Sequence, residues 1–192
     1  MKRTSLVLLA CLLLASPWAC TPGGGGPSKP GGLDVGDAAY EFALPDSTGR
    51  TMRMSDVKKD WYLMLVFYRG HWCTACLNQM LDLKRDFDQF AALKTAVAAI
   101  SVDPPDISAE FNASWRFPFP LLSDRSLEVI DAYGARHPQG HEGKDISKPL
   151  IIIVSPDRKV VFKYLGHSPV DRPTDEDLLL WLRNHAAGQK AP

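Results

Sequence analysis

The sequence is poor in cysteine. Only four of its 192 residues are cysteines, and two of them, Cys11 and Cys20, lie within the first 20 positions. A folded domain further along the chain would hold only Cys73 and Cys76, which excludes a framework of structural disulfides. No second cysteine pair follows, so a zinc site of four cysteines is excluded too. If either cysteine forms an intramolecular disulfide within that domain, its partner is the other.

The chain also lacks an excess of charge of either sign. Its Lys and Arg residues number 22 and its Asp and Glu residues number 22, which gives a formal net charge of +0. Such a balance gives no reason to expect nucleic acid or an acidic surface as a partner. The hydrophobic content of 45% and the absence of internal repeats are typical of a single globular domain.

Hydrophobic runs long enough to cross a membrane comfortably are also missing. The apolar stretch at residues 6–15 follows the charged start Met1-Lys2-Arg3 and has the length of an export signal rather than of a transmembrane helix. We therefore predict an export signal at residues 1–20, a Gly/Pro-rich linker at 21–32, a folded domain at 33–187 and a tail at 188–192.

Cys20 stands at the border between the predicted signal and the linker. This position resembles the lipid-attachment cysteine of bacterial lipoproteins, although Pro17 and Trp18 depart from that pattern. The expected location is the periplasmic face of a bacterial membrane, with a lipid on Cys20. Cleavage near Cys20 without lipidation would instead give a free periplasmic or secreted protein.

The most informative motif is the pair of cysteines at positions 73 and 76. An apolar run at 63–67 precedes the pair, and an amphipathic helical pattern follows it through Met80, Leu83, Phe87 and Phe90. The unpaired N–H groups at a helix start favour a thiolate, which is the reactive form of cysteine. Because Cys76 lies on the apolar stripe, we expect it to be more buried than Cys73.

The rest of the domain alternates between predicted strands and helices. The hydrophobic pattern predicts a hairpin within 34–57, strands at 61–68, 96–102, 119–122, 150–154 and 160–165, and helices near 76–90, 108–115 and 126–133. Thr174 and the three acidic residues that follow it predict the start of a last helix. Strands separated by helices indicate an α/β fold whose sheet is covered on both faces.

Four stretches of the sequence resemble the redoxin branch of the thioredoxin fold, which includes the alkyl hydroperoxide reductase and thiol-specific antioxidant (AhpC/TSA) family. They are residues 36–46, 67–73, 119–124 and 132–134. The resemblance covers about residues 33–186. It implies a thioredoxin-like fold with a central mixed β-sheet flanked by helices and an N-terminal β-hairpin extension.

The sequence departs from the peroxiredoxin pattern around the dithiol. Peroxiredoxins typically have a threonine three residues before the attacking cysteine and a proline four residues before that threonine. Aligned in this way, the attacking cysteine is Cys76, and Cys73 and Arg69 replace the two supporting residues. An arginine that peroxiredoxins place before a late strand is absent near Lys148. Pro149 there resembles the cis-proline of thioredoxin-like disulfide reductases.

These departures favour an exported thiol-disulfide oxidoreductase. Cys73 would attack the disulfide of a partner protein and Cys76 would resolve the mixed disulfide. Arg69 and His71 are candidates for lowering the pKa of the attacking thiol, and Trp72 is a candidate for shielding the sulfur and contacting the partner. The redox-active disulfide would be the only cofactor. A thiol donor in the membrane would have to keep it reduced.

Three alternatives remain open. In a peroxiredoxin-like thiol peroxidase, Cys76 or Cys73 would attack a hydroperoxide, and the other cysteine would condense with the resulting sulfenic acid. In a metal carrier, His137 and His141 would join the two cysteines, although Pro138 and Gly140 predict a loop there. A non-catalytic binding domain is the third, and the intact dithiol argues against it.

Overall fold

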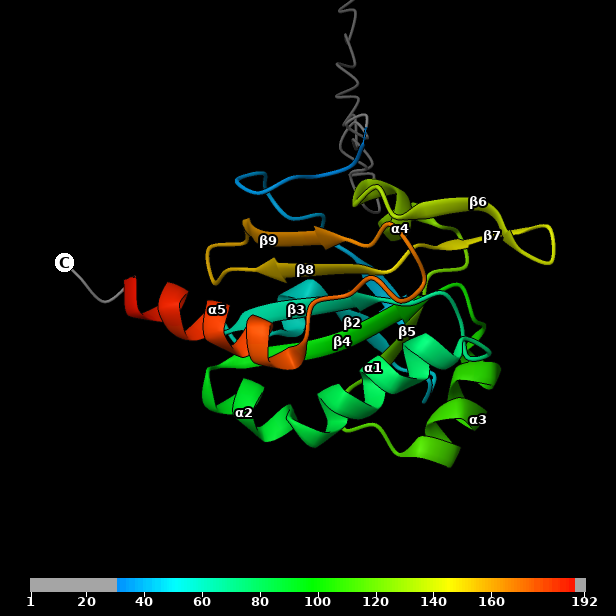
Figure 1. Cartoon of the computed structure of the whole chain (residues 1–192), viewed down its shortest axis with the longest axis horizontal. Helices are drawn as coiled ribbons and strands as arrows, with labels where there is room; N and C mark the ends of the chain where they lie inside the picture. Colours follow the sequence, from blue (N-terminus) through cyan, green and yellow to red (C-terminus); the bar gives the residue numbers. More distant parts are fainter. Residues whose placement is uncertain (1–30, 189–192) are drawn as a thin grey trace, which may run out of the picture.

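A five-stranded sheet forms the centre of the computed structural model, which describes residues 31–188 (Figure 1). Its strand order is β5-β4-β3-β8-β9, where β3 and β4 are parallel, as are β4 and β5, and β8 and β9 run antiparallel to their neighbours. The strands are β3 (Tyr62–Phe67), β4 (Thr95–Ser101), β5 (Leu121–Ser123), β8 (Leu150–Val154) and β9 (Val160–Leu165). The predicted export signal with Cys20, most of the predicted linker and all but the first residue of the predicted tail lie outside the described residues.

Helices cover both faces of this sheet. They are α1 (Thr74–Arg85), α2 (Phe87–Ala92), α3 (Pro105–Trp115), α4 (Glu128–Ala132) and α5 (Asp175–Gly188). Figure 1 shows α1, α2, α3 and α5 on one side of the sheet and α4 on the other. Successive residues of β3 alternate between the two sides: Met64 packs in the core with α1, and Leu63 packs in the core with α4.

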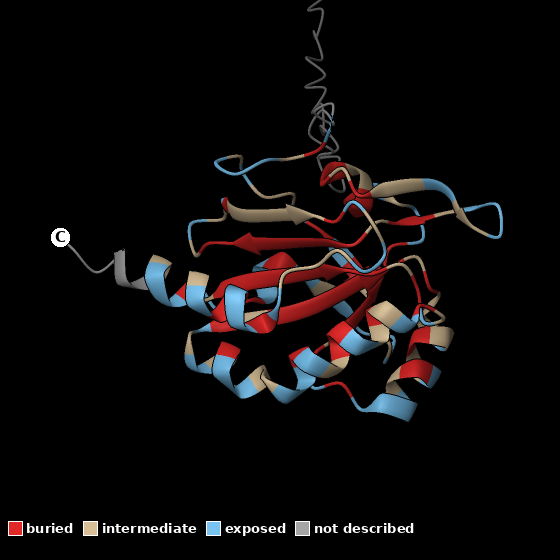
Figure 2. Cartoon of the chain, viewed as in Figure 1, coloured by how far each residue is buried: buried red, intermediate tan, exposed pale blue. Residues whose placement is uncertain are grey.

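Both faces of the central strands are therefore buried, as Figure 2 shows. This arrangement confirms the predicted α/β fold, a central mixed sheet flanked by helices. Within the described residues, no helix has both the length and the hydrophobicity that crossing a bilayer requires.

Two hairpins lie outside the central sheet. Strands β1 (Ala43–Pro45) and β2 (Thr51–Arg53) form the predicted N-terminal hairpin. Strands β6 (Arg136–His141) and β7 (Lys144–Ser147) form the second, where the sequence analysis wrongly predicted a loop. A shift of register between His137 and His141 accommodates the proline and the glycine between them, because a bulge tolerates residues that a regular ladder does not.

The helix predicted after Cys76 is in fact two helices. Asp86 ends α1 and begins α2 with φ −99° and ψ 7°, outside helical geometry. Phe90 still reaches the core, so the break at Asp86 preserves the apolar stripe.

The first described residues, around Gly32, pack closely against the turn that follows α4. Gly32 and Gly134 have φ of +81° and +76°, and a Cβ on either would lie 2.2 Å from the nearest backbone atom of the other segment. Both positions therefore require glycine. The Leu33 N–H donates to the carbonyl of Ala132 at 2.8 Å, next to this contact.

The start of α5 contains a buried carboxyl group. Thr174 caps the helix, as predicted: its hydroxyl accepts from the N–H of Asp177 at 3.2 Å, and Asp177 accepts from Thr174 in return. The next residue, Asp175, is only 6% exposed, and one of its carboxyl oxygens has no hydrogen-bond partner. Burial, together with the nearby carboxylates of Asp86 and Asp82, raises the pKa of Asp175 to about 7.

This raised pKa predicts that stability falls with increasing pH. Folding favours the protonated form of Asp175, so its stabilising contribution is complete at low pH and is lost as the pH rises from 3.8 to about 7. Asp175→Asn should therefore raise the free energy of unfolding at pH 8 by roughly 1–4 kcal/mol, and the melting temperature with it. At pH 4 it should have little effect on either. Thermal unfolding followed by circular dichroism from pH 4 to pH 8 measures this.

The exposed neighbour Glu176 supplies the matched control. Glu176→Gln should produce no such pH-dependent gain. A gain from Asp175→Asn of equal size at every pH would contradict the assignment of the titrating group.

Candidate active site

The two cysteines of the motif form a disulfide at the start of α1. The loop after β3 delivers Cys73 to the N-cap position of the helix, and its Sγ accepts the N–H of Cys76 at 3.2 Å. Their Cα atoms lie 5.2 Å apart, so one helical turn brings the sulfurs together. Cys73 is 5% exposed and Cys76 is 0% exposed. The expected order of burial is confirmed, but both residues are buried.

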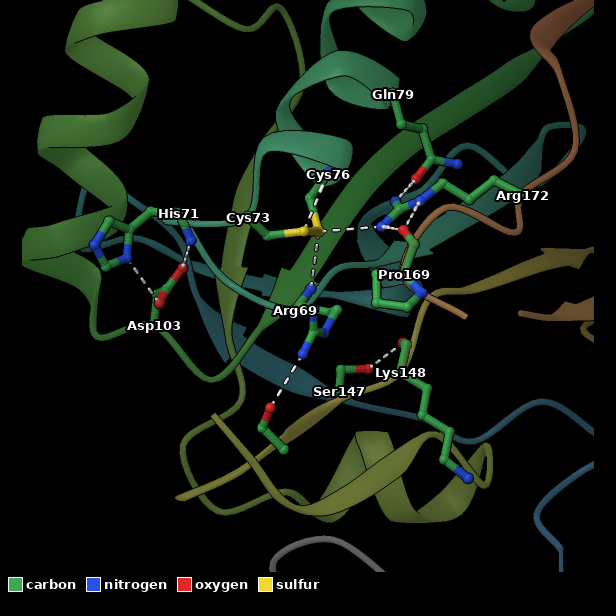
Figure 3. Close-up of a disulfide and its surroundings, with 11 residues drawn as sticks. Arg69, His71, Cys73, Cys76, Gln79, Asp103, Ser147, Lys148, Pro169 and Arg172 are labelled. Carbon is green, nitrogen blue, oxygen red and sulfur yellow. Dashed lines mark hydrogen bonds and ion pairs between the residues drawn. A yellow bond between two sulfur atoms is a disulfide. The ribbon is translucent and has the colours of Figure 1, made fainter. Parts of the chain in front are cut away.

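Arg172 is the residue at this site that the sequence analysis missed. It lies in the segment between β9 and α5, and its Nη2 donates to Sγ of Cys76 at 3.1 Å (Figure 3). The same nitrogen donates to the carbonyl of Pro169 at 3.0 Å, and Nη1 donates to Oε1 of Gln79 on α1. No sequence motif connects an arginine in this segment with a cysteine 96 residues earlier.

The charge of Arg172 has no counterion among the described residues. Its acceptors are an amide oxygen, a carbonyl oxygen and a disulfide sulfur, all of them neutral. Burial and the nearby Arg69 lower the pKa of Arg172 to about 10, so the guanidinium remains protonated at neutral pH. A thiolate at Cys76 would supply the missing negative charge, and the site therefore favours ionisation of that thiol.

Arg69 contacts the sulfur of Cys76 through its backbone and contacts the β6–β7 hairpin through its side chain. Its N–H points to Sγ of Cys76 at 3.4 Å, while Nη2 donates to the carbonyl of Gly140 at 3.0 Å. The guanidinium carbon also lies 5.0 Å from the centre of the Trp72 ring, within the range of a cation–π interaction.

Trp72 packs against the same hairpin. Its ring stacks on that of His141 with centroids 3.5 Å apart and an interplanar angle of 15°. His141 is therefore a stacking partner of the residue that precedes Cys73. Within residues 31–188, no group of three or more His, Cys, Asp or Glu side chains could hold a metal ion, so the metal-carrier hypothesis gains no support.

His71 faces away from the disulfide, as Figure 3 shows. The ring Nδ1 of His71 lies 3.2 Å from one carboxylate oxygen of Asp103, and the backbone N–H of His71 donates to the other oxygen at 2.7 Å. The side chain is exposed. His71 thus ties the active-site loop to the end of β4.

Pro149 does not follow a cis peptide bond, since the described residues contain none. The cis isomer that the resemblance to disulfide reductases implied is therefore wrong for this position. Backbone hydrogen bonds hold the junction before β8 on both sides: Lys148 donates to Ala135, and Gly166 donates to the carbonyl of Pro149. The trans chain thereby continues directly into β8.

Comparisons with known proteins agree with this fold. Peroxiredoxin Bcp of Escherichia coli strain K12 is 27% identical over 161 residues, which cover 80% of this chain and 98% of that protein. The crystal structure of peroxidoxin BcpB from Mycobacterium tuberculosis superposes with a TM-score of 0.71 at 29% identity, covering 79% of this chain and 97% of that one. A cysteine mutant of PrxQ from Xylella fastidiosa has the same fold, with a TM-score of 0.71 at 20% identity, covering 80% and 98%.

The sequence profile of the AhpC/TSA family matches residues 35–163, which include both cysteines but end before Arg172. Since the match spans most of the domain, the chain belongs to the AhpC/TSA family.

Proposed function

We propose that this protein is a thiol peroxidase of the peroxiredoxin type, in which Cys76 attacks a hydroperoxide. The contact between the Arg172 guanidinium and Sγ of Cys76 carries this proposal. The peroxiredoxin pattern aligns its attacking cysteine with Cys76 and expects an arginine just before the late strand, where this chain reads Ser147-Lys148-Pro149. In this protein a positive charge reaches Cys76 from a different segment.

The proposed reaction has two steps. The Cys76 thiolate attacks the terminal oxygen of the hydroperoxide, so an S–O bond forms, the O–O bond breaks, and the leaving alkoxide takes a proton to become an alcohol. The Cys73 thiol then attacks the sulfenic acid on Cys76, so that the S–S bond forms and hydroxide leaves with the thiol proton as water. An external thiol returns the disulfide to the dithiol.

Burial favours a small substrate over a protein disulfide. Neither cysteine is more than 5% exposed, and the stacked Trp72–His141 pair packs beside the loop that carries them. A hydroperoxide group can enter such a site more readily than a disulfide held in a protein. The relatives from E. coli and M. tuberculosis are likewise named as a peroxiredoxin and a peroxidoxin.

Disulfide exchange through Cys73 is the second candidate. One observation favours it: Sγ of Cys73 accepts an N–H group at the start of α1, and such a contact also stabilises a thiolate. The two candidates differ in which cysteine attacks first, and single substitutions separate them.

Replacing each cysteine distinguishes peroxidase from exchange activity. Cys76→Ser should reduce hydroperoxide consumption at least a hundredfold because the attacking sulfur is lost. Cys73→Ser should still form a sulfenic acid on Cys76, visible by mass spectrometry as one added oxygen, but should not close the disulfide. Reduction of insulin disulfides, assayed in parallel with the same dithiol donor, measures exchange. If Cys73→Ser abolishes both activities and Cys76→Ser traps mixed disulfides, exchange is the function.

Replacing Arg172 tests the electrostatic argument. Arg172→Gln should raise the pKa of the Cys76 thiol and lower the second-order rate with hydroperoxide by roughly 10- to 100-fold at pH 7. The pH–rate profile should move to higher pH, and Arg172→Lys should recover part of the loss. Arg183→Gln, an exposed arginine on α5, is the control and should leave the profile in place. An unchanged profile in Arg172→Gln would falsify the role of this charge.

We further propose that the protein is exported and carries a lipid on Cys20, with a thiol donor at the membrane as its reductant. The charged start, the short apolar run and the position of Cys20 support this. Expressed in a bacterium, the protein should partition with membranes, and Cys20→Ser should release it to the soluble fraction. Wild-type protein that is soluble and uncleaved would contradict export.

A further inference from the structure

A cavity of about 210 Å³ lies beside the dithiol, between the β7–β8 junction and the segment that follows β9. The residues that line it come from four parts of the chain: Arg69 after β3, His137 on β6, Lys148 and Pro149 before β8, and residues 165–169 from the end of β9 onward.

The charged and titratable side chains around this cavity are all basic. Arg69, His137, Lys148 and His167 line it, and no Asp or Glu is among the lining residues. Since the whole chain has a net charge of +0, the cationic character is local. An anion is the ligand that such a lining attracts.

Asp171 follows the lining residues 165–169 in sequence, and its carboxylate is already engaged. Asp171 accepts the hydroxyl of Tyr164 and the backbone N–H of His167. Lys148 belongs to no ion pair found among the described residues. An anion in the cavity would supply the partner that Lys148 lacks among the described residues.

The cavity shares two of its walls with the sulfur site. Arg69, which lines the cavity, presents its backbone N–H to Sγ of Cys76 at 3.4 Å. Pro169, on another wall, accepts from Arg172 Nη2, and this nitrogen also contacts Cys76. Figure 3 shows Arg69 between the disulfide and the Ser147–Lys148 backbone. Arg69 and the segment from Pro169 to Arg172 therefore border both the cavity and the dithiol.

We infer that this cavity binds the carboxylate of a small molecule that reacts at the dithiol, with Lys148 and the histidines holding the anion. The inference rests on the proposed function. The carboxylate can belong to a small thiol that reduces the disulfide, or to an organic hydroperoxide. A thiol would act in two exchanges: its thiolate attacks one sulfur and releases the other cysteine as a thiolate, and a second thiolate then frees the dithiol and leaves as a small-molecule disulfide.

Direct binding tests the cavity without any turnover. The full chain in its disulfide form is titrated with butyrate, and with uncharged butyramide as the control probe, while the ring signals of His137 and His167 are followed by NMR. Butyrate should bind saturably and butyramide should not. Lys148→Gln should weaken butyrate binding about tenfold, whereas Lys144→Gln, an exposed lysine of the same hairpin outside the cavity, should not. Equal binding in the two variants, or none in wild type, would overturn the inference.

Kinetics then identify the source of the carboxylate. The rates of disulfide reduction by 3-mercaptopropionate and by neutral 2-mercaptoethanol are measured in each variant, and the ratio of the two rates cancels their intrinsic reactivities. A ratio that falls about tenfold only in Lys148→Gln supports the thiol. The same fall for a carboxylated over a neutral hydroperoxide supports the peroxide. No change in either ratio overturns the reactant assignment.

These readouts also separate the inference from the proposed function. If hydroperoxide is not consumed while butyrate still binds and the thiol ratio still depends on Lys148, the peroxidase proposal fails and the cavity assignment stands.

Discussion

The placement of one guanidinium against one sulfur is the constraint around which the rest of this site is arranged. Arg172 reaches Cys76 because Gln79 on α1 and the carbonyl of Pro169 hold its remaining donors. The segment that carries Arg172 ends at the capped start of α5. The position of that helix therefore decides whether the charge lies next to the sulfur. Asp175, three residues later, couples the same segment to α1 and α2 through its interaction with Asp86.

The central sheet makes this convergence possible. Strand β3 ends at the loop that delivers the dithiol to α1, and β8 runs antiparallel beside it, starting at the same end. The hairpin formed by β8 and β9 returns the chain to that end, where the segment with Arg172 begins. Three parts of the chain that are distant in sequence thus meet at the same end of strands β3, β8 and β9. The second hairpin, β6–β7, adds a cover through the stacking of Trp72 on His141.

Most of the fold and the pairing of Cys73 with Cys76 could be predicted from the sequence because both depend on local patterns. The buried strand at Leu150–Val154 and the cap at Thr174 were placed correctly, since runs of β-branched residues and capping residues determine structure over short distances. Arg172 could not be predicted, because its role arises from a tertiary contact with no characteristic spacing, and it lies beyond the residues that match the family profile.

The errors have equally physical causes. Pro138 and Gly140 predict a loop, but a bulged register tolerates both within a hairpin. The apolar stripe after Cys76 continues past Asp86, so hydrophobic spacing alone does not reveal that the helix breaks there into α1 and α2. Pro149 is trans because isomer choice depends on the surrounding backbone contacts, which a resemblance at one position does not report.

The unbalanced charge of Arg172 also bears on the electrochemistry of the pair. Reducing the disulfide places a negatively charged sulfur beside a cation that otherwise faces only neutral acceptors. The Arg172 guanidinium therefore stabilises the reduced form of the pair. Stabilising the reduced form raises the midpoint potential of a dithiol couple. The couple should thus accept electrons from comparatively weak donors.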